Sequence, residues 1–298
     1  MKSAVPAVLL LLLTPAVAGD PPPQLRVRMD RGKTWHVDQT VEIDTDGPAP
    51  SKAADGTVAG ARTSFKITEK WSDYCDSEEA RVVKVVKRTY SSSKLKVGKT
   101  PGVSDIELCG FTITPSEAAC TAAANKGKPQ ALTTRLLEMS PPELCVLLLP
   151  PGGANRTGAA WMVPAGNVRA LQLTAMAGVG SVRGPAREAL LLDLERLDAG
   201  GGQGALATLV NAKIVNVTAR NIAQIKYAGE AALEDSRGTP GNTDIKLTAE
   251  GSLDFDMVEG RPVKLEWREV LTIPALKVDG VEQQKGWQET LTINRTYK

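Results

Sequence analysis

The stretch IKLTAEGSLDFDM, residues 245–257, places apolar side chains or glycine on the odd-numbered positions and polar side chains on the even-numbered ones. Side chains of a β-strand alternate between its two faces, so this pattern predicts a strand with one buried and one wet face. After the turn-like segment VEGRP, residues 258–262, the alternation resumes at Val263 and continues to Ile273, interrupted only at Glu269. The two runs therefore predict an antiparallel hairpin.

Shorter runs with the same period of two flank this hairpin. Residues 223–233 alternate upstream of it and residues 287–293 downstream, so the chain from about residue 205 onward is predicted to form an antiparallel meander. In the first half, residues 35–43 and 65–71 show the same alternation. The fold class that follows is mainly β with a few helices (α+β), built from long curved antiparallel sheets.

Strands of this length must twist, and their apolar face must be covered by another element. Three Leu- and Ala-rich segments, residues 130–149, 166–177 and 186–197, are predicted to be the covering helices. The third could equally be a strand.

The first residues have the features of a secretory signal peptide. Lys2 precedes an apolar run over residues 4–13, and Ala16-Val17-Ala18 matches the small-residue cleavage pattern. We therefore expect residues 1–18 to be removed after Ala18. The apolar run is too short to span a bilayer, and no later segment is long and apolar enough to do so. The mature chain is expected to be periplasmic or secreted.

The export signal affects how the cysteines are interpreted. Cys75, Cys109, Cys120 and Cys145 form an even set, which favours two disulfides in an oxidising compartment, and three connectivities are possible. Pairing of Cys109 with Cys120 and of Cys75 with Cys145 is preferred. Zinc is the competing interpretation, but no C-x-x-C pair exists and the single histidine, His36, lies far upstream.

The chain divides, on this evidence, into a signal peptide (1–18), an N-terminal β-rich domain with the four cysteines (19–150) and a C-terminal antiparallel meander domain with covering helices (151–298). Residues 32–37 and 158–163 share the pattern G-x-x-W-x-V, and a β-like segment follows each. This repetition suggests that the two halves are related by duplication.

Charge and motifs argue against several functions. The 298 residues carry 36 Lys and Arg against 34 Asp and Glu, without a basic stripe, so a nucleic-acid partner is not expected.

Ser91 and Lys94 have the S-x-x-K spacing of penicillin-binding enzymes, but the S-D-N and K-T-G elements of that site are missing. Glu250, Asp254 and Asp256 share the polar face of one predicted strand, where solvated acids are expected. We expect no enzyme activity, cofactor or metal.

A set of Gly, Pro and aromatic positions recurs through the second half of the chain: Leu149-Pro150-Pro151, Gly158, Trp161, Val163-Pro164, Gly251, Leu253, Phe255-Asp256 and Gly260-Arg261-Pro262. In these positions, residues 145–298 resemble exported β-rich bacterial proteins that are related in outline to half-barrel lipoprotein carriers. The resemblance implies no assigned activity, and the four cysteines of the first half depart from it.

Two functions are therefore expected from different classes. The first is a non-enzymatic structural or interaction protein of the cell envelope that presents its sheets to an unidentified protein. The alternative is a carrier that holds an apolar ligand, a lipid or a lipoprotein, in the concave face of a curved sheet. The residues expected to line that face are Ile245, Leu247, Leu253, Phe255, Val263, Leu265 and Trp267.

Overall fold

The computed structural model describes residues 25, 27, 32–46, 63–75, 85–98, 104–105, 111–115, 120–124, 148–150, 154–164, 167–168, 171, 208–233, 245–278, 281–284 and 286–298. Its strands, in chain order, are β1 (Thr34–Asp46), β2 (Thr63–Cys75), β3 (Val85–Val97), β4 (Ser104–Asp105), β5 (Phe111–Pro115), β6 (Cys120–Ala124), β7 (Ala160–Pro164), β8 (Thr208–Val217), β9 (Ile222–Leu233), β10 (Ile245–Asp256), β11 (Arg261–Ile273), β12 (Leu276–Val278), β13 (Val281–Gln284) and β14 (Trp287–Tyr297).

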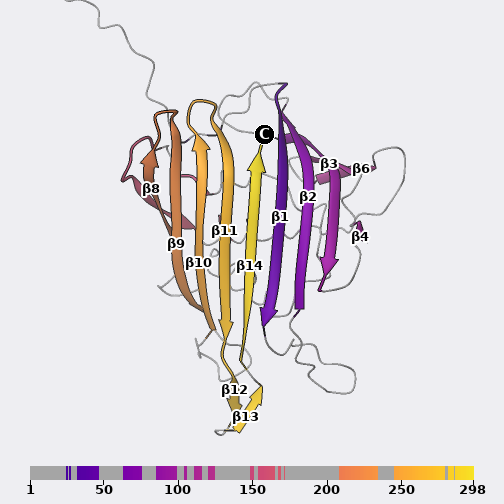
Figure 1. Ribbon diagram of the computed structural model, residues 1–298, viewed down its shortest axis with the longest axis vertical. Coiled ribbons are helices and arrows are strands. Elements are labelled where there is room, and N and C mark those ends of the chain that lie inside the picture. The colour runs from indigo at the N-terminus through magenta and orange to yellow at the C-terminus, as the bar shows by residue number, and fades with distance from the viewer. Residues whose placement is uncertain are drawn as a thin grey trace, which may run out of the picture.

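All strands except β12 and β13 belong to one 12-stranded sheet with the order β6-β5-β3-β2-β1-β14-β11-β10-β9-β8-β7, and β4 pairs with β3 beside this path. Neighbouring strands are antiparallel throughout. Figure 1 shows the long strands side by side, with β14 and β1 at the centre and the β12–β13 hairpin beyond one end of the sheet. The predicted mainly β, antiparallel fold is therefore confirmed.

Strands from both predicted domains contribute to this single sheet. Among the described strands, the path starts at the centre with β1 and proceeds outward to β6, and the second half returns from the opposite edge at β7 to the centre at β14. Strand β14 then pairs with β1 along its length, from Val37 opposite Tyr297 to Asp46 opposite Gln288. The first and the last strand therefore join the two halves.

Little of the predicted helices falls on described residues. Residues 148, 167, 168 and 171 are helical, which agrees with the predictions for 130–149 and 166–177 at those positions. The rest of those segments and the whole of 186–197 lie outside the described residues.

The alternation in the sequence sets the two faces of the sheet. Odd-numbered side chains of β1, β9, β10 and β14 are mostly buried on one face, called the inner face, and even-numbered ones point to the opposite, outer face. Because the register aligns odd positions, buried residues form rows across the strands. In one such row, Val41 of β1 lies between Ile67 of β2 and Ile293 of β14.

One bulge departs from the predicted alternation. Phe255 pairs with Pro262, and Asp254 pairs with Lys264, so Val263 is the extra residue on β11. Val263 is only half-buried as a result, and Pro262 takes the buried position expected for it. The predicted hairpin of residues 245–273 is otherwise confirmed.

The turn between β10 and β11 is fixed by two local features. The carboxylate of Asp256 accepts hydrogen bonds from the backbone N–H groups of Val258 and Glu259, each at 2.9 Å. Gly260 adopts a positive φ of 64°, which a residue without Cβ tolerates well. The sequence VEGRP therefore forms a turn that returns the chain directly to the sheet.

The two G-x-x-W-x-V segments have similar local structure. Gly32 and Gly158 both have positive φ, 78° and 88°, and each precedes a strand that carries the tryptophan of its motif. Strand β1 lies at the centre of the sheet and β7 at its edge. The duplication itself stays a prediction.

Candidate functional site

On the inner face of β9, β10 and β11, the aromatic rings of Tyr227 and Trp267 contact each other beside Gly251. The register places Gly251 directly between Tyr227 and Trp267. The two ring centroids are 5.8 Å apart and the ring planes make an angle of 55°. Because Gly251 has no side chain, the indole of Trp267 can lie against the backbone of β10 and reach the tyrosine ring.

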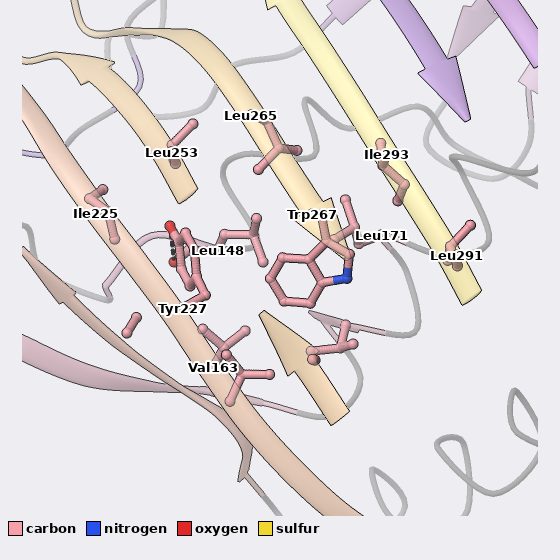
Figure 2. Close-up of a cluster of buried hydrophobic side chains, with 14 of the residues drawn as sticks. Leu148, Val163, Leu171, Ile225, Tyr227, Leu253, Leu265, Trp267, Leu291 and Ile293 are labelled. Atoms are coloured by element: carbon pink, nitrogen blue, oxygen red, sulfur yellow. Dashed lines mark hydrogen bonds between the residues drawn. The ribbon is translucent and has the colours of Figure 1, made fainter. Parts of the chain in front are cut away.

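Residues from outside the main strands pack on this part of the inner face. Leu148, Val168 and Leu171 are fully buried members of the same apolar cluster as the sheet residues. The indole N–H of Trp161 donates to the carbonyl of Leu148 at 3.0 Å, and the hydroxyl of Tyr227 donates to the same carbonyl at 3.4 Å. Figure 2 shows Leu148 beside Tyr227 and Leu171 beside Trp267. The chain's own residues thus cover the aromatic pair on this face.

The residues expected to line an apolar ligand face lie together on β10 and β11. Ile245 is half-buried and Val263 is the half-buried bulge residue. The fully buried ones are Leu247, Leu253, Phe255, Leu265 and Trp267.

The inner face of the other half carries a buried polar cluster, which the sequence analysis did not predict. The guanidinium of Arg295 donates from Nε at 3.0 Å and from Nη2 to the amide oxygen of Gln39, and from Nη1 at 3.3 Å to the hydroxyl of Tyr297. The amide of Gln39 donates at 2.8 Å to Glu69, whose other oxygen accepts from Ser93 at 3.1 Å. We call Arg295, Gln39, Glu69 and Ser93 the seam network, since it connects β14, β1, β2 and β3.

Aromatic rings enclose the seam network. The guanidinium carbon of Arg295 lies 5.2 Å from the centroid of the Trp71 ring, within the range of a cation–π contact. Trp71 also contacts Tyr90, with 5.7 Å between ring centroids. Arginine suits such a place because its planar guanidinium stacks on rings while it donates several hydrogen bonds.

Two of the buried tryptophans donate a hydrogen bond from the indole N–H to a carboxylate on their own strand. Trp71 donates its indole N–H to Asp73 at 3.2 Å, and Trp267 donates to Glu269 at 2.7 Å. Positions i and i+2 of a strand share a face, so the acid two residues after the tryptophan is placed to accept a hydrogen bond from the indole N–H. The interruption of the apolar pattern at Glu269 is thereby explained, because a buried indole N–H requires a partner.

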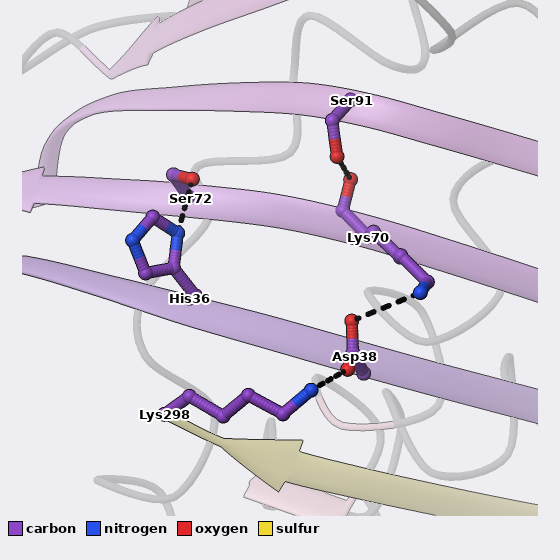
Figure 3. A network of polar contacts seen from close by, with 6 residues as sticks. All are labelled: His36, Asp38, Lys70, Ser72, Ser91 and Lys298. Carbon is purple, nitrogen blue, oxygen red and sulfur yellow. Dashed lines mark hydrogen bonds and ion pairs between the residues drawn. The ribbon is translucent and has the colours of Figure 1, made fainter.

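Figure 3 shows polar residues on the outer face of β1, β2 and β3, together with Lys298, which follows β14. Nδ1 of His36 lies 2.8 Å from the hydroxyl of Ser72, and the hydroxyl of Ser91 donates at 3.1 Å to the backbone carbonyl of Lys70. Lys94 is exposed on the same face. The hydroxyl of Ser91 thus forms a hydrogen bond to the backbone of the neighbouring strand, β2.

Asp38 lies between two lysines on the same face. The ammonium of Lys298 is 2.5 Å from one carboxylate oxygen of Asp38, and that of Lys70 is 3.9 Å from the other. The hydrogen bond from Lys298, followed by the charges of both lysines, holds the pKa of Asp38 below its ordinary value, against the opposing effect of burial. The associated stabilisation is present at neutral pH and is lost as the pH falls through the lowered pKa.

Lys298→Gln should raise the pKa of Asp38 toward its ordinary value, because the largest contribution to the shift is removed. Titration of the Asp38 carboxyl carbon by NMR measures this directly. Lys66→Gln is the matched control, since Lys66 pairs with Glu42 rather than Asp38. An Asp38 midpoint that moves equally in both variants would contradict this assignment.

A hollow of about 340 Å³ lies on the outer face of β9, β10, β11 and β14. Its outward side chains include Lys226, Glu250, Ser252, Glu266 and Arg268. Arg268 pairs with Glu250 at 3.3 Å, and Ser252 donates to Glu266 at 3.2 Å. Of the three acids predicted on this strand face, the structure brings Glu250 to the hollow, while Asp256 caps the turn.

Glu266 is held in its ionised form. Lys264 lies 2.6 Å from it, and this hydrogen bond is the main reason that the pKa of Glu266 falls below its ordinary value, with smaller contributions from Ser252 and the charge of Lys226. The same contact raises the pKa of Lys264. Glu266 therefore stays ionised at neutral pH, with Lys264 as its partner.

Several predicted features lie wholly or partly outside the described residues. Residues 1–18, Cys109 and Cys145 are not described, and Cys75 and Cys120 lie at a strand end and a strand start. The signal peptide and the disulfides stay predictions. Among the described residues, no group of three His, Cys, Asp or Glu is placed to hold a metal ion. No helix in the described part is long and apolar enough to cross a bilayer.

No protein-family model and no curated protein matches this chain. Similar solved structures include lipovitellin, described for its lipid–protein interactions, with 6% identity, a TM-score of 0.34, and coverage of 90% of this chain and 25% of that one. A β-barrel-like protein of a domain of unknown function from Brucella abortus has 8% identity, a TM-score of 0.19, and coverage of 88% and 96%. The outer membrane protein AlkL in DMPC bilayers has 9% identity, a TM-score of 0.18, and coverage of 100% and 97%.

This chain spans about a quarter of the lipovitellin chain that it matches. All three TM-scores are too low to assign a family or a function.

Proposed function

We propose that the protein is an exported, non-enzymatic interaction protein in which the sheet is a rigid support for a polar outer face. The observation that carries this proposal is the burial of the described inner-face residues by the chain's own side chains. Leu148, Val168 and Leu171 are fully buried in the same apolar cluster as the Tyr227–Trp267 pair. A buried inner face of this kind supports a scaffold, since a carrier needs apolar surface that its ligand can reach.

The non-enzymatic part of the proposal is supported by the candidate catalytic residues. Ser91 and Lys94, the pair with the S-x-x-K spacing, are exposed on the sheet surface, and the hydroxyl of Ser91 donates to a backbone carbonyl. A serine nucleophile requires donors that stabilise the oxyanion, normally within an enclosed site. The export part rests on the signal-peptide pattern of residues 1–18.

A carrier of an apolar ligand is the second candidate, and one feature favours it. The inner face of β9, β10 and β11 is apolar over consecutive rows, with Ile225, Leu253 and Leu265 aligned in one of them. Such a surface would suit an acyl chain if the covering side chains could move aside.

Native mass spectrometry of protein purified from its host distinguishes the two candidates. We expect the apoprotein mass, no lipid in a solvent extract, and no uptake of an apolar fluorescent probe. Leu171→Ala is the positive control for probe uptake, because removal of a fully buried side chain opens an apolar cavity. A stoichiometric lipid on the wild-type protein would overturn the scaffold proposal in favour of the carrier.

A further inference from the structure

The hollow on the outer face is concave because small residues lie between long ones. Ala228 and Ser252 point outward on β9 and β10, and Lys226 and Glu250 flank them on the same strands. The side chains of Tyr227 and Trp267 are buried on the inner face, so these residues contribute only backbone to its floor. Its volume of about 340 Å³ lies within the range of sites for small molecules.

The floor of the hollow is held in place by the packing beneath it. It is the backbone around Gly251, directly above the packed Tyr227–Trp267 pair. The Arg268–Glu250 and Lys264–Glu266 ion pairs stand around this floor with side chains that are about half exposed. A hollow with a fixed floor loses less conformational entropy when a ligand binds.

Opposite charges face each other across the hollow in a single row of the sheet. Lys226, Ser252 and Glu266 pair directly with one another across β9, β10 and β11. Neighbouring strands are about 4.8 Å apart, so the strands that carry the lysine and the glutamate are separated by roughly 9.6 Å, with the short serine between them. This spacing suits a ligand that carries one charge of each sign at its two ends.

We propose that the hollow binds a short zwitterionic ligand of dipeptide size, lying over Ser252 with its carboxylate at Lys226 and its ammonium at Glu266. This inference rests on the proposed function and deepens it, since it names the chemistry that the outer face recognises. Asn294 and Thr292 border the same hollow and offer hydrogen bonds to the peptide group.

Two other ligand classes fit the hollow less well. Lys226 and Arg268 lie among Glu250 and Glu266 in the lining, and Lys264 pairs with Glu266, so charges of both signs are interspersed and a polyanion or polycation meets no surface of a single sign. A saccharide usually stacks on an aromatic ring, and the rings of Tyr227 and Trp267 point to the opposite face.

The test is an NMR titration of the full mature chain with glycylglycine, compared with the uncharged mimic N-acetylglycine N-methylamide and with maltose. Glycylglycine should shift the amide signals of Ser252, Glu266 and their neighbours, and the other two probes should not. Lys226→Gln and Glu266→Gln should each weaken binding about fivefold, as expected for loss of one partly exposed ion pair.

Ser252→Tyr should abolish binding by filling the hollow. Thr248→Tyr is its matched control, because Thr248 lies on the same face of β10 and does not line the hollow. If Ser252→Tyr fails to fold, the two charge-neutralising variants at exposed positions still decide the question. Equal binding of the uncharged mimic, preferential binding of maltose, or no shift around the hollow would overturn this inference.

The two proposals fail in different ways. A lipid found in the interior contradicts the scaffold proposal whatever the hollow binds. A clean apoprotein that does not bind glycylglycine contradicts only the ligand assigned to the hollow.

Discussion

Arg295→Met is expected to lower the free energy of unfolding by about 3 kcal/mol, the largest effect of a single substitution considered for this protein. The Arg295 side chain is 2% exposed and supplies hydrogen bonds to Gln39 and Tyr297. Gln39 in turn donates to Glu69. Methionine replaces most of the volume but none of the donors, so polar groups that cannot reach water lose their partners.

Urea denaturation measures this loss, and Arg268→Met provides the matched control. Arg268 is 52% exposed on the outer face and has one carboxylate partner, Glu250, so the same substitution there should change stability by no more than about 0.5 kcal/mol. Equal effects in the two variants would show that the seam network adds no net stability.

Gly251→Ala is expected to destabilise the protein by about 2 kcal/mol, although replacing glycine with alanine in a strand normally stabilises it. A Cβ at this position would lie 2.8 Å from Cε3 of Trp267 and 2.9 Å from the backbone oxygen of Glu266. Neither atom can retreat easily, since the indole is fully buried and the oxygen belongs to the neighbouring strand. The Tyr227–Trp267 pair would have to separate.

Thermal or urea unfolding of Gly251→Ala should be compared with that of Ser252→Ala. Ser252 is the next residue along β10 and points to the outer face, where the shorter side chain should have almost no effect. A Gly251→Ala variant as stable as the wild type would show that the indole does not depend on the glycine for its position.

The period of two predicted the fold because it requires only local sequence. Residues 245–257 contain one apolar or glycine residue at each odd position, and this places them on one face of a strand whichever strands lie beside it. Pairing of β1 with β14 has no such local signal. Val37 and Tyr297 become neighbours only through the complete strand order, which no short stretch of sequence specifies.

The seam network was missed although its positions follow the same alternation. Gln39, Glu69 and Arg295 occupy odd positions of their strands and are therefore on the buried face, but polar side chains were expected to point to water. The residues that follow two of the tryptophans could have indicated buried polar side chains on this face. Trp71 and Trp267 are each followed two residues later by an acid, and a buried indole requires an acceptor on its own face.

The hollow could not be predicted from the alternation alone. Lys226, Ser252 and Glu266 belong to three strands, and their alignment depends on a register that the sequence does not state. The bulge at Val263 is equally hidden, because it changes the pairing without changing the alternation of residue types along β11.

The pairing of the first strand with the last also sets the order in which the fold can be completed. During synthesis, β1 leaves the ribosome long before β14 has been made. Until then, the edge of β1 that β14 covers is unpaired. Its backbone donors and acceptors can pair with any other extended chain. Contacts between residues so far apart in sequence form slowly, so this edge of β1 stays uncovered longer than the edges that pair with strands close in sequence.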